Sequence, residues 1–402
     1  MKQLYLSGFG ISLNVDRARL LIRNGLSEPD TVREQITVLP RNAPFDSVIV
    51  DGHSGSLSLD AIKWLARHNI AMFVLDFNGK ILTSMLPREP VNGALKLAQL
   101  ATYNNPQKRM LISKRLIAAK AQRTLDVLEW LDSRYDRIDS VTDSIRLKMK
   151  RIDESESLPR LMQVEGDIAD RYWDQLMKIL PKKFGFVSRM HESHQMNSAD
   201  QVNTLVNYCY SILESQVRKA LNSVGLEATI GFLHEARQTK YSLCYDVMEP
   251  YRFLADTTVI ECLEHDRFGR KDFYRLDNYV LRLKPEAVKK LLDALRIKFN
   301  SPVRYRNKLY GWDVIMRLKA QELAAFILNK RTTISFEEPR PVLQRDDSET
   351  LREAILSMSA SEARRRGIRG NTLWYAQRRA KSREQFKIYT NLKSRICEPS
   401  VS

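Results

Sequence analysis

The stretch NTLVNYCYSILESQVRKALNSVG, residues 203–225, is the part of the chain that most clearly indicates a fold. Its apolar residues recur every three or four positions, which is the period of an α-helix with one buried face. Gly225 follows the last turn and is a typical helix end, because glycine adopts the left-handed backbone conformation without strain. Most segments between residues 91 and 330 show the same period. The sequence therefore predicts a large α-helical domain over 91–330.

The first ninety residues have a different character. Short apolar runs such as KQLYLSG and FDSVIVDG are separated by glycine and aspartate, which is typical of β-strands joined by turns. In IAMFVLDFNGKILTSML, the pair Asn78-Gly79 between two apolar arms predicts a hairpin with a type I′ turn. One helix interrupts the strands, with Ser58 as its N-cap. We expect a β-rich domain over 1–90.

The end of the chain predicts a linker and a small basic module. Residues 331–348 lose the helical period and contain two prolines, so they are interpreted as a linker. Residues 349–402 predict a helix followed by a second helix, a turn at Gly367 and a third, basic helix. That order is the signature of a DNA-binding helix-turn-helix, whose last helix enters the major groove. A helical hairpin packed on the main domain is the alternative.

Two local patterns support the helices of this module. Ser359 and Glu362 form a capping-box pattern, and Asn371 or Thr372 can cap the last helix. The residues that we expect to contact DNA here are arginines and one tryptophan: Arg364, Arg365, Arg366, Arg369, Trp374, Arg378 and Arg379. The predicted fold class is therefore a multidomain α+β protein, mainly α, with a C-terminal helix-turn-helix.

The charge of the chain points to a polyanionic partner. Its 402 residues contain 65 Lys and Arg against 48 Asp and Glu, a net charge of +17. Residues 351–395 alone contain 12 Lys and Arg against 3 Glu, so more than half of the excess lies in one short region. Because neutralisation of phosphates by Lys and Arg supplies most sequence-independent affinity for nucleic acids, this concentration favours double-stranded DNA as the partner.

The sequence also indicates a compartment. No apolar run approaches the length of a membrane span, and the N-terminus lacks the apolar core of a signal peptide. The four cysteines show no CxxC spacing, which disfavours zinc fingers and a disulfide framework. We therefore expect no membrane partner and a location in a reducing, prokaryotic cytoplasm, in association with the nucleoid.

One histidine and three acids form a candidate site. His234 lies in GFLHEAR, upstream of Asp246 and Glu249, and Glu165 lies far upstream in LMQVEGDIADRYW. Each residue also has a purely structural interpretation. His234 can be a hydrogen-bonded histidine without a ligand, Asp246 and Glu249 can share a solvated helix face at the spacing i, i+3, and Glu165 can be a surface charge. Phosphodiester chemistry, however, needs a divalent ion, which carboxylates and an imidazole can hold. Carboxylate oxygens suit Mg²⁺, and one imidazole in the set favours Mn²⁺.

Four motifs in order resemble a known family. They are the pair Glu165-Gly166, the helix NTLVNYCY from Asn203 to Tyr210, the segment GFLH from Gly231 to His234, and DVMEPYR from Asp246 to Arg252. Together they resemble the CRISPR-associated adaptation endonuclease/integrase family over roughly residues 1–325. That family has an N-terminal β-sandwich and a larger helical catalytic lobe. Four motifs in the right order are far more specific than any one of them.

The resemblance implies roles for individual residues. It places the metal ligands on Glu165, His234 and Glu249, with Asp246 as a neighbouring acid that completes or supports the site. It further implies that Tyr208 and Asn207 line the site and that Arg252 pairs with a carboxylate. Arg237 and Lys240 are expected to contact DNA phosphates. The basic helix RMLISKRLIAAKAQR is expected to follow the DNA backbone through four cations: Arg109, Lys114, Arg115 and Lys120. The alternative is that these cations form a solvated face.

The basic tail is a departure from the ordinary CRISPR enzyme, which ends after the helical lobe. A helical lobe followed by a helix-turn-helix resembles the casposases, which integrate mobile-element ends with terminal inverted repeats. The function implied is transesterification, in which the 3′-OH ends of casposon DNA are joined to a target site. The alternatives are a CRISPR adaptation integrase that inserts spacers into a repeat array, and a DNA-binding protein without catalysis. Because two strands are joined, we expect a homo-oligomer, at least a dimer, and a tetramer on DNA.

Overall fold

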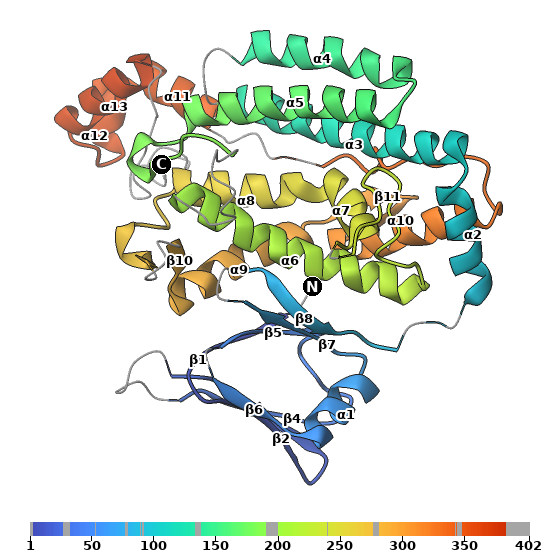
Figure 1. Cartoon of the computed structure of the whole chain (residues 1–402). Helices are drawn as coiled ribbons and strands as arrows, with labels where there is room; N and C mark the ends of the chain where they lie inside the picture. The colour runs from blue at the N-terminus through green and yellow to red at the C-terminus, as the bar shows by residue number, and fades with distance from the viewer. Residues whose placement is uncertain are drawn as a thin grey trace.

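The structure is a computed structural model, and it describes residues 3–26, 33–52, 54–76, 79–88, 90, 92–132, 138–189, 200–238, 240–275, 281–341, 343 and 348–382. Figure 1 shows a two-sheet N-terminal part, a large helical part and a group of short C-terminal helices. Each of the three parts has its own cluster of buried apolar side chains. The predicted class, a mainly helical α+β protein with a β-sandwich-like N-terminal domain, is confirmed.

Two four-stranded sheets build the N-terminal domain. The first has the order β1-β5-β7-β8 and contains β1 (Gln3–Gly8), β5 (Ser47–Gly52), β7 (Ala71–Leu75) and β8 (Ile81–Met85). The second has the order β4-β3-β2-β6 and contains β2 (Ile11–Asp16), β3 (Arg19–Arg23), β4 (Gln35–Val38) and β6 (Gly55–Leu57). Helix α1 (Leu59–Arg67) begins after Ser58, whose hydroxyl accepts a hydrogen bond from the Ala61 amide at 3.1 Å, so the predicted N-cap is confirmed.

The predicted hairpin in this domain is also confirmed. Strands β7 and β8 pair antiparallel, and Gly79 has a φ of +78° in the connecting turn. The Asp76 amide donates to the Lys80 carbonyl at 2.7 Å and closes the loop. Asn78, which was expected to share the turn, lies outside the described residues.

The first sheet is buried on both faces, because successive side chains of a strand point to opposite sides. Tyr5 and Ile49 belong to the core of the helical domain, whereas their neighbours Leu6 and Val48 belong to the core between the two sheets. This sheet is therefore the surface on which the helical domain rests (Figure 1).

A buried polar network ties that sheet to the helical domain. The Asp51 carboxylate in β5 accepts hydrogen bonds from Tyr5 at 2.6 Å and Tyr208 at 3.3 Å. Arg282 reaches the same carboxylate at 2.6 Å. Tyr208, which the family resemblance placed in the catalytic site, thus takes part in the contact between the domains.

The helical domain consists of nine α-helices of the described chain, with short 3₁₀ turns and two small hairpins between them. Its α-helices are α2 (Gly93–Tyr103), α3 (Pro106–Asp132), α4 (Asp139–Glu154), α5 (Leu158–Ile179), α6 (Gln201–Val224), α7 (Ser242–Met248), α8 (Arg252–Glu264), α9 (Pro285–Asn300) and α10 (Trp312–Ile327). The 3₁₀ turns are η1 (Lys182–Phe184), η2 (Glu249–Tyr251) and η3 (Arg270–Asp272). The hairpins are formed by β9 (Phe273–Arg275) with β10 (Leu281–Leu283), and by β11 (Val303–Tyr305) with β12 (Lys308–Tyr310).

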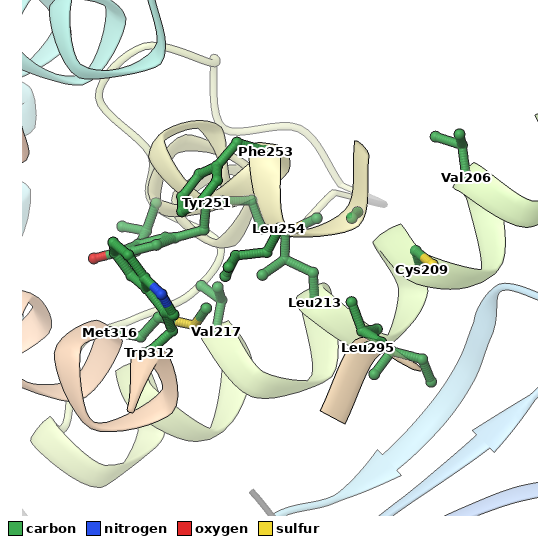
Figure 2. Close-up of a cluster of buried hydrophobic side chains, with 14 of the residues drawn as sticks. Val206, Cys209, Leu213, Val217, Tyr251, Phe253, Leu254, Leu295, Trp312 and Met316 are labelled. Atoms are coloured by element: carbon green, nitrogen blue, oxygen red, sulfur yellow. The ribbon is translucent and has the colours of Figure 1, made fainter. Parts of the chain in front are cut away.

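Helix α6 is the centre of this domain. It ends at Gly225 with a φ of +82°, which confirms the predicted C-terminal stop. Its apolar stripe has members three or four residues apart: Val206, Cys209, Leu213 and Val217. Figure 2 shows this stripe facing side chains from η2, α8, α9 and α10. Across from the stripe, the rings of Tyr251 and Phe253 meet Trp312 edge to face, with centroid distances of 6.2 and 5.1 Å. The short segment between α7 and α8 is therefore held rigidly by its own aromatic residues.

The segment that was interpreted as a linker has no helix or strand in its described residues, 331–341 and 343. It nevertheless packs on the helical domain, because Ile334 and Phe336 are buried in that domain's core. Arg123 of α3 donates hydrogen bonds to the carbonyl oxygens of Glu337 and, at 2.6 Å, of Pro339. The first part of the linker is thus fixed beside α3.

Three short helices follow: α11 (Ser348–Ser357), α12 (Ala360–Arg365) and α13 (Gly370–Ser382). Ser359 caps α12 by accepting from the Glu362 amide at 3.2 Å, as predicted, and Gly367 has a φ of +66° in the following turn. Helix α13 begins at Gly370, so Asn371 and Thr372 lie inside its first turn and the predicted cap there is wrong. The helix-turn-helix assignment itself stays a prediction.

None of the helices in the described part of the chain is both long enough and apolar enough to cross a membrane. The described cysteines, Cys209, Cys244 and Cys262, are buried thiols without a disulfide.

Candidate active site

Glu165 and Glu249 reach the same place from different helices. Glu165 lies in the middle of α5, next to the buried Val164, and Glu249 opens η2 directly after α7. The Lys120 ammonium of α3 donates to the Glu165 carboxylate and lies 2.6 Å from Oε2 of Glu249. The structure therefore brings together two of the three predicted metal ligands, around the positive charge of a lysine.

Arg252 completes the surroundings of Glu249. Its Nε lies 3.0 Å from Oε2 of Glu249, and its guanidinium packs over the Tyr210 ring at 4.6 Å. Burial alone would raise the pKa of Glu249, but Arg252 and Lys120 outweigh it and lower that pKa to about 2. Burial likewise opposes the charge of Lys120, yet Glu249 and Glu165 raise the pKa of its ammonium. Glu249 and Lys120 are therefore both charged at neutral pH.

Asp246 has a different set of partners from Glu249, although both lie in the DVMEPYR segment. Its buried carboxylate accepts hydrogen bonds from three consecutive backbone amides: those of Phe232, of Leu233 at 2.9 Å and of His234 at 3.0 Å. Asp246 and Glu249 are only 0% and 4% exposed, which excludes a solvated helix face as the reason for this pair of acids.

His234 is oriented by the same carboxylate. Its Nδ1 lies 2.7 Å from Oδ1 of Asp246, and this hydrogen bond is the main reason that the pKa of the imidazole is raised above its usual value. The side chain is 36% exposed. Because Asp246 holds Nδ1, Nε2 is the nitrogen that a ligand can reach. Carboxylate-held imidazoles of this kind are typical of metal-ligating histidines.

The loop that carries His234 is fixed from three further positions. Gly231 lies against Asp246, and a Cβ atom at this position would come within 2.8 Å of Oδ2 of Asp246 and of Ser242. Arg109 of α3 donates to the Phe232 carbonyl at 2.8 Å. Gln99 of α2 donates to the carbonyl oxygens of Glu227 and Ile230, both at 2.9 Å. The glycine of the GFLH motif is thus needed for the close approach of Asp246.

The donor set fits a divalent ion in part. The carboxylates of Glu165 and Glu249 already share one cation, and the imidazole presents Nε2. Together these groups are suitable ligands for Mg²⁺ or Mn²⁺. Within the described ranges, however, no three His, Cys, Asp or Glu side chains lie close enough to hold an ion together. Lys120 takes the place between the two acids that an ion would need.

Two basic residues of α3 that were expected to follow DNA are only partly exposed and bond within the protein. Arg109 supports the His234 loop, and Lys120 joins the acids. A signal for Lys120 exists in the sequence, because it falls three residues after Ile117 and seven before Val127, on the apolar stripe of the helix. A lysine on a buried stripe indicates a carboxylate partner inside the protein.

The predicted DNA contacts on the helical domain lie mainly on its surface. Arg237 and Lys240 are exposed on the segment after His234, and Arg115 is exposed on α3. Lys114 is half-buried and donates to the Asp153 carbonyl at 2.6 Å. Arg237 and Lys240 therefore lie on the surface shortly after His234 in the sequence, whereas the Lys114 ammonium is already hydrogen-bonded within the protein.

In the C-terminal module, most of the predicted contacts are exposed: Arg364, Arg365, Arg369, Trp374 and Arg378. Trp374 is 53% exposed, with the Arg378 guanidinium 5.4 Å from its ring centroid. Arg366 is half-buried and forms an ion pair with Glu362 at 2.9 Å. The side chain of Arg379 and residues 383–402 lie outside the described residues.

Comparison with known proteins assigns the chain to a family. The chain belongs to the Cas1 family of CRISPR associated proteins, whose family profile matches residues 4–296. Among curated proteins, it is similar to "CRISPR-associated endonuclease Cas1 1" of Archaeoglobus fulgidus, with 29% identity over 350 residues that cover 82% of this chain and 97% of the relative.

Solved structures refine the assignment. The chain is similar to a casposase bound to integration product, with 37% identity and a TM-score of 0.82, over 89% of this chain and 99% of the casposase. A Cas1 protein from Thermotoga maritima shares the fold, with 21% identity and a TM-score of 0.68, over 83% of this chain and 99% of the other. The resemblance to casposases as relatives of the Cas1 family is confirmed.

Proposed function

We propose that this protein is a metal-dependent DNA integrase that joins the 3′-OH ends of mobile-element DNA, bearing terminal inverted repeats, to a target site by transesterification. The observation that carries the proposal is the pairing of Glu165 and Glu249 on one cation, in a domain that also holds His234 by its Nδ1. The similarity to a casposase bound to integration product supports DNA joining over cleavage alone.

Glu165, Glu249 and Nε2 of His234 would hold the ion, which is Mn²⁺ or Mg²⁺. The ion would neutralise the phosphate and stabilise the charges that develop on the attacking and leaving oxygens. The chain's own residues prepare the site: Asp246 fixes the imidazole, and Arg252 orients Glu249 from its place over the Tyr210 ring. Because a hydroxyl attacks the phosphodiester directly, no covalent bond to the protein is needed.

The C-terminal module would hold double-stranded DNA away from the reacting phosphate. Its exposed arginines suit backbone phosphates, and Trp374 beside Arg378 presents an aromatic surface to a groove. We propose that α12, the turn at Gly367 and α13 act as a helix-turn-helix. Two joined strands need two active sites, so the working form would be at least a dimer, and a tetramer on DNA.

The second candidate function is a CRISPR adaptation integrase that inserts spacers into a repeat array with the help of a partner protein. The Cas1 family membership and the names of the curated relatives favour it. A third candidate is a DNA-binding protein that has lost catalysis. The close approach of Glu165 and the buried Glu249 to one lysine argues against this third role, because a buried ionic cluster is costly to keep without a function.

A plasmid-joining assay with the purified full-length protein, Mn²⁺ and inverted-repeat oligonucleotides tests the proposal. We expect joining by the protein alone, and its loss in His234→Ala and in Glu165→Ala with DNA binding retained. The exposed His265 and Glu156 provide matched controls, His265→Ala and Glu156→Ala, which should join normally. Strict dependence on a second protein would favour the adaptation integrase. Joining that survives both site substitutions would rule out the assigned site.

A further inference from the structure

Lys120 is the cation shared by Glu165 and Glu249 in the described part of the chain. It extends from α3, donates to Glu165, and lies 2.6 Å from Oε2 of Glu249. Its side chain is 19% exposed, so the ammonium is largely withdrawn from water. The family motifs contain both acids and Arg252, but they contain no counterpart of Lys120.

The charges of this cluster balance without a metal. Two carboxylates face two cations, Lys120 and Arg252. A divalent ion bound to both carboxylates would leave an excess of two positive charges in a partly buried place, which is unfavourable in a medium of low dielectric constant. One of the resident cations must therefore withdraw, or an anion must enter together with the ion.

Lys120 is the cation that can withdraw. The Arg252 guanidinium is packed over the Tyr210 ring at 4.6 Å, and its neighbours Tyr251 and Phe253 are fixed in the core. A lysine carries a compact charge on a flexible four-carbon stem, with donors that rotate freely. Lys120 lines a cavity of about 100 Å³, whose other lining residues include Thr124, Arg189, Tyr210, Glu249 and Asp256. The ammonium therefore has room to move without unfolding its helix.

We propose that Lys120 keeps the metal-free centre closed to a divalent ion, and that a DNA phosphate receives its ammonium when the ion binds. This inference rests on the proposed metal site and adds a coupling to it. The ion and DNA then bind cooperatively, since each supplies what the other requires: the ion displaces the ammonium, and the phosphate gives the ammonium a new partner. By linkage, each raises the affinity for the other by the same factor.

The test is the affinity for Mn²⁺ of the full-length protein, measured by titration calorimetry with and without a DNA duplex that ends in dideoxynucleotides and cannot be joined. The wild type should bind Mn²⁺ about tenfold more tightly with DNA than without it, within the usual range of coupling between sites. Lys120→Met should bind Mn²⁺ about tenfold more tightly than the wild type in the absence of DNA, and should respond little to DNA.

The matched control is Lys108→Met on the same helix, because the Lys108 ammonium bonds Asn329 at 2.8 Å and lies away from the acids. It should behave as the wild type. Lys120→Arg retains a cation and should keep the weak affinity for Mn²⁺ without DNA. Lys120→Met can have a low melting temperature, because Glu165 and Glu249 then face each other without a cation. In that case Mn²⁺ should raise its melting temperature by more than it raises that of the wild type, which reports the same competition between the ammonium and the ion.

Two results would overturn the inference. One leaves the proposed metal site intact, and the other rules it out as well. If Lys120→Met binds Mn²⁺ no more tightly than the wild type without DNA, while Glu249→Gln abolishes binding, Lys120 does not compete and the metal site stands. If neither the wild type nor Lys120→Met binds Mn²⁺ with or without DNA, the proposed metal site fails together with the inference.

Discussion

Asp246 holds His234 from two sides: its Oδ1 lies 2.7 Å from the imidazole Nδ1 and also accepts the His234 backbone amide at 3.0 Å. The other carboxylate oxygen, Oδ2, accepts the amides of Phe232 and Leu233. With four donors in place, the carboxylate has little capacity left to bind a metal directly. We therefore propose that Asp246 contributes to the candidate site by positioning His234.

Asp246→Asn should disrupt this loop. An amide has one acceptor oxygen, and its NH₂ group would face backbone donors, so we expect a loss of about 3 kcal/mol in the free energy of unfolding. Joining activity should fall with it, because His234 loses its orientation. Thermal melting and the plasmid assay measure the two effects, with the exposed Asp153→Asn as the control. An Asp246→Asn protein with unchanged melting and joining would contradict the positioning role.

Gly231→Ala and Gly166→Ala should have opposite effects on stability, although both glycines belong to family motifs. The added Cβ at Gly231 would meet Asp246 and Ser242 at 2.8 Å, and such overpacking costs about 1–3 kcal/mol. At Gly166, inside α5, nothing lies within 4 Å of the new Cβ. Alanine there should stabilise the helix by up to about 1 kcal/mol. Melting temperatures of the two variants decide this, and equal shifts would contradict it.

Asp256 should make stability depend on pH. Burial raises its pKa from 3.8 to about 6 in the folded protein, although Tyr210 and Tyr172 donate hydrogen bonds to it. For an acid with a raised pKa, the stabilising contribution is fully present below the unfolded value and is lost as pH rises through the folded value. The loss amounts to about 3 kcal/mol between pH 4 and pH 7. Asp256→Asn mimics the protonated form, so its melting temperature relative to the wild type should increase over this range. A constant difference would show that Asp256 is ionised throughout.

Removal of residues 345–402 should weaken DNA binding and leave the chemical centre intact. The deletion begins after the segment that Arg123 holds, so that the buried residues Phe336 and Pro339 are retained. Loss of phosphate contacts by Arg364, Arg365, Arg369 and Arg378 should reduce the slope of log affinity against log salt by about 3 to 4. Fluorescence anisotropy at several salt concentrations measures the slope. An unchanged slope would place the DNA contacts elsewhere.

Deleting a further stretch, from residue 331 onward, provides a contrast. This deletion would remove Ile334 and Phe336 from the core and leave Arg123 without its carbonyl partners, so the helical domain itself should lose stability. Comparison of the two deletions by thermal melting separates the contribution of residues 331–344 to stability from that of the C-terminal module. Equal melting temperatures would mean that the segment contributes nothing to the domain.

Much of this molecule follows from local patterns in the sequence. The period of residues 203–225 determined the helix and its end at Gly225, because a buried stripe and a left-handed stop are properties of a single segment. The hairpin of β7 and β8 and the caps at Ser58 and Ser359 were equally local. The motifs with Glu165, His234, Asp246 and Glu249 led to the family, which the match over residues 4–296 confirms. The roles of these four residues in a metal site stay a prediction.

The partners of those residues were decided only by tertiary structure. Asp246 and Glu249 are three residues apart, yet one faces the loop of His234 and the other faces Lys120 and Arg252. Lys120 is 45 positions from Glu165 in sequence, and the two meet because α3 and α5 pack side by side. Helical period can tell which face of a segment is buried. Which charged side chain a residue on that face meets depends on how distant helices pack. For this reason only the tertiary structure showed that Lys120, which the sequence placed against DNA, lies between Glu165 and Glu249.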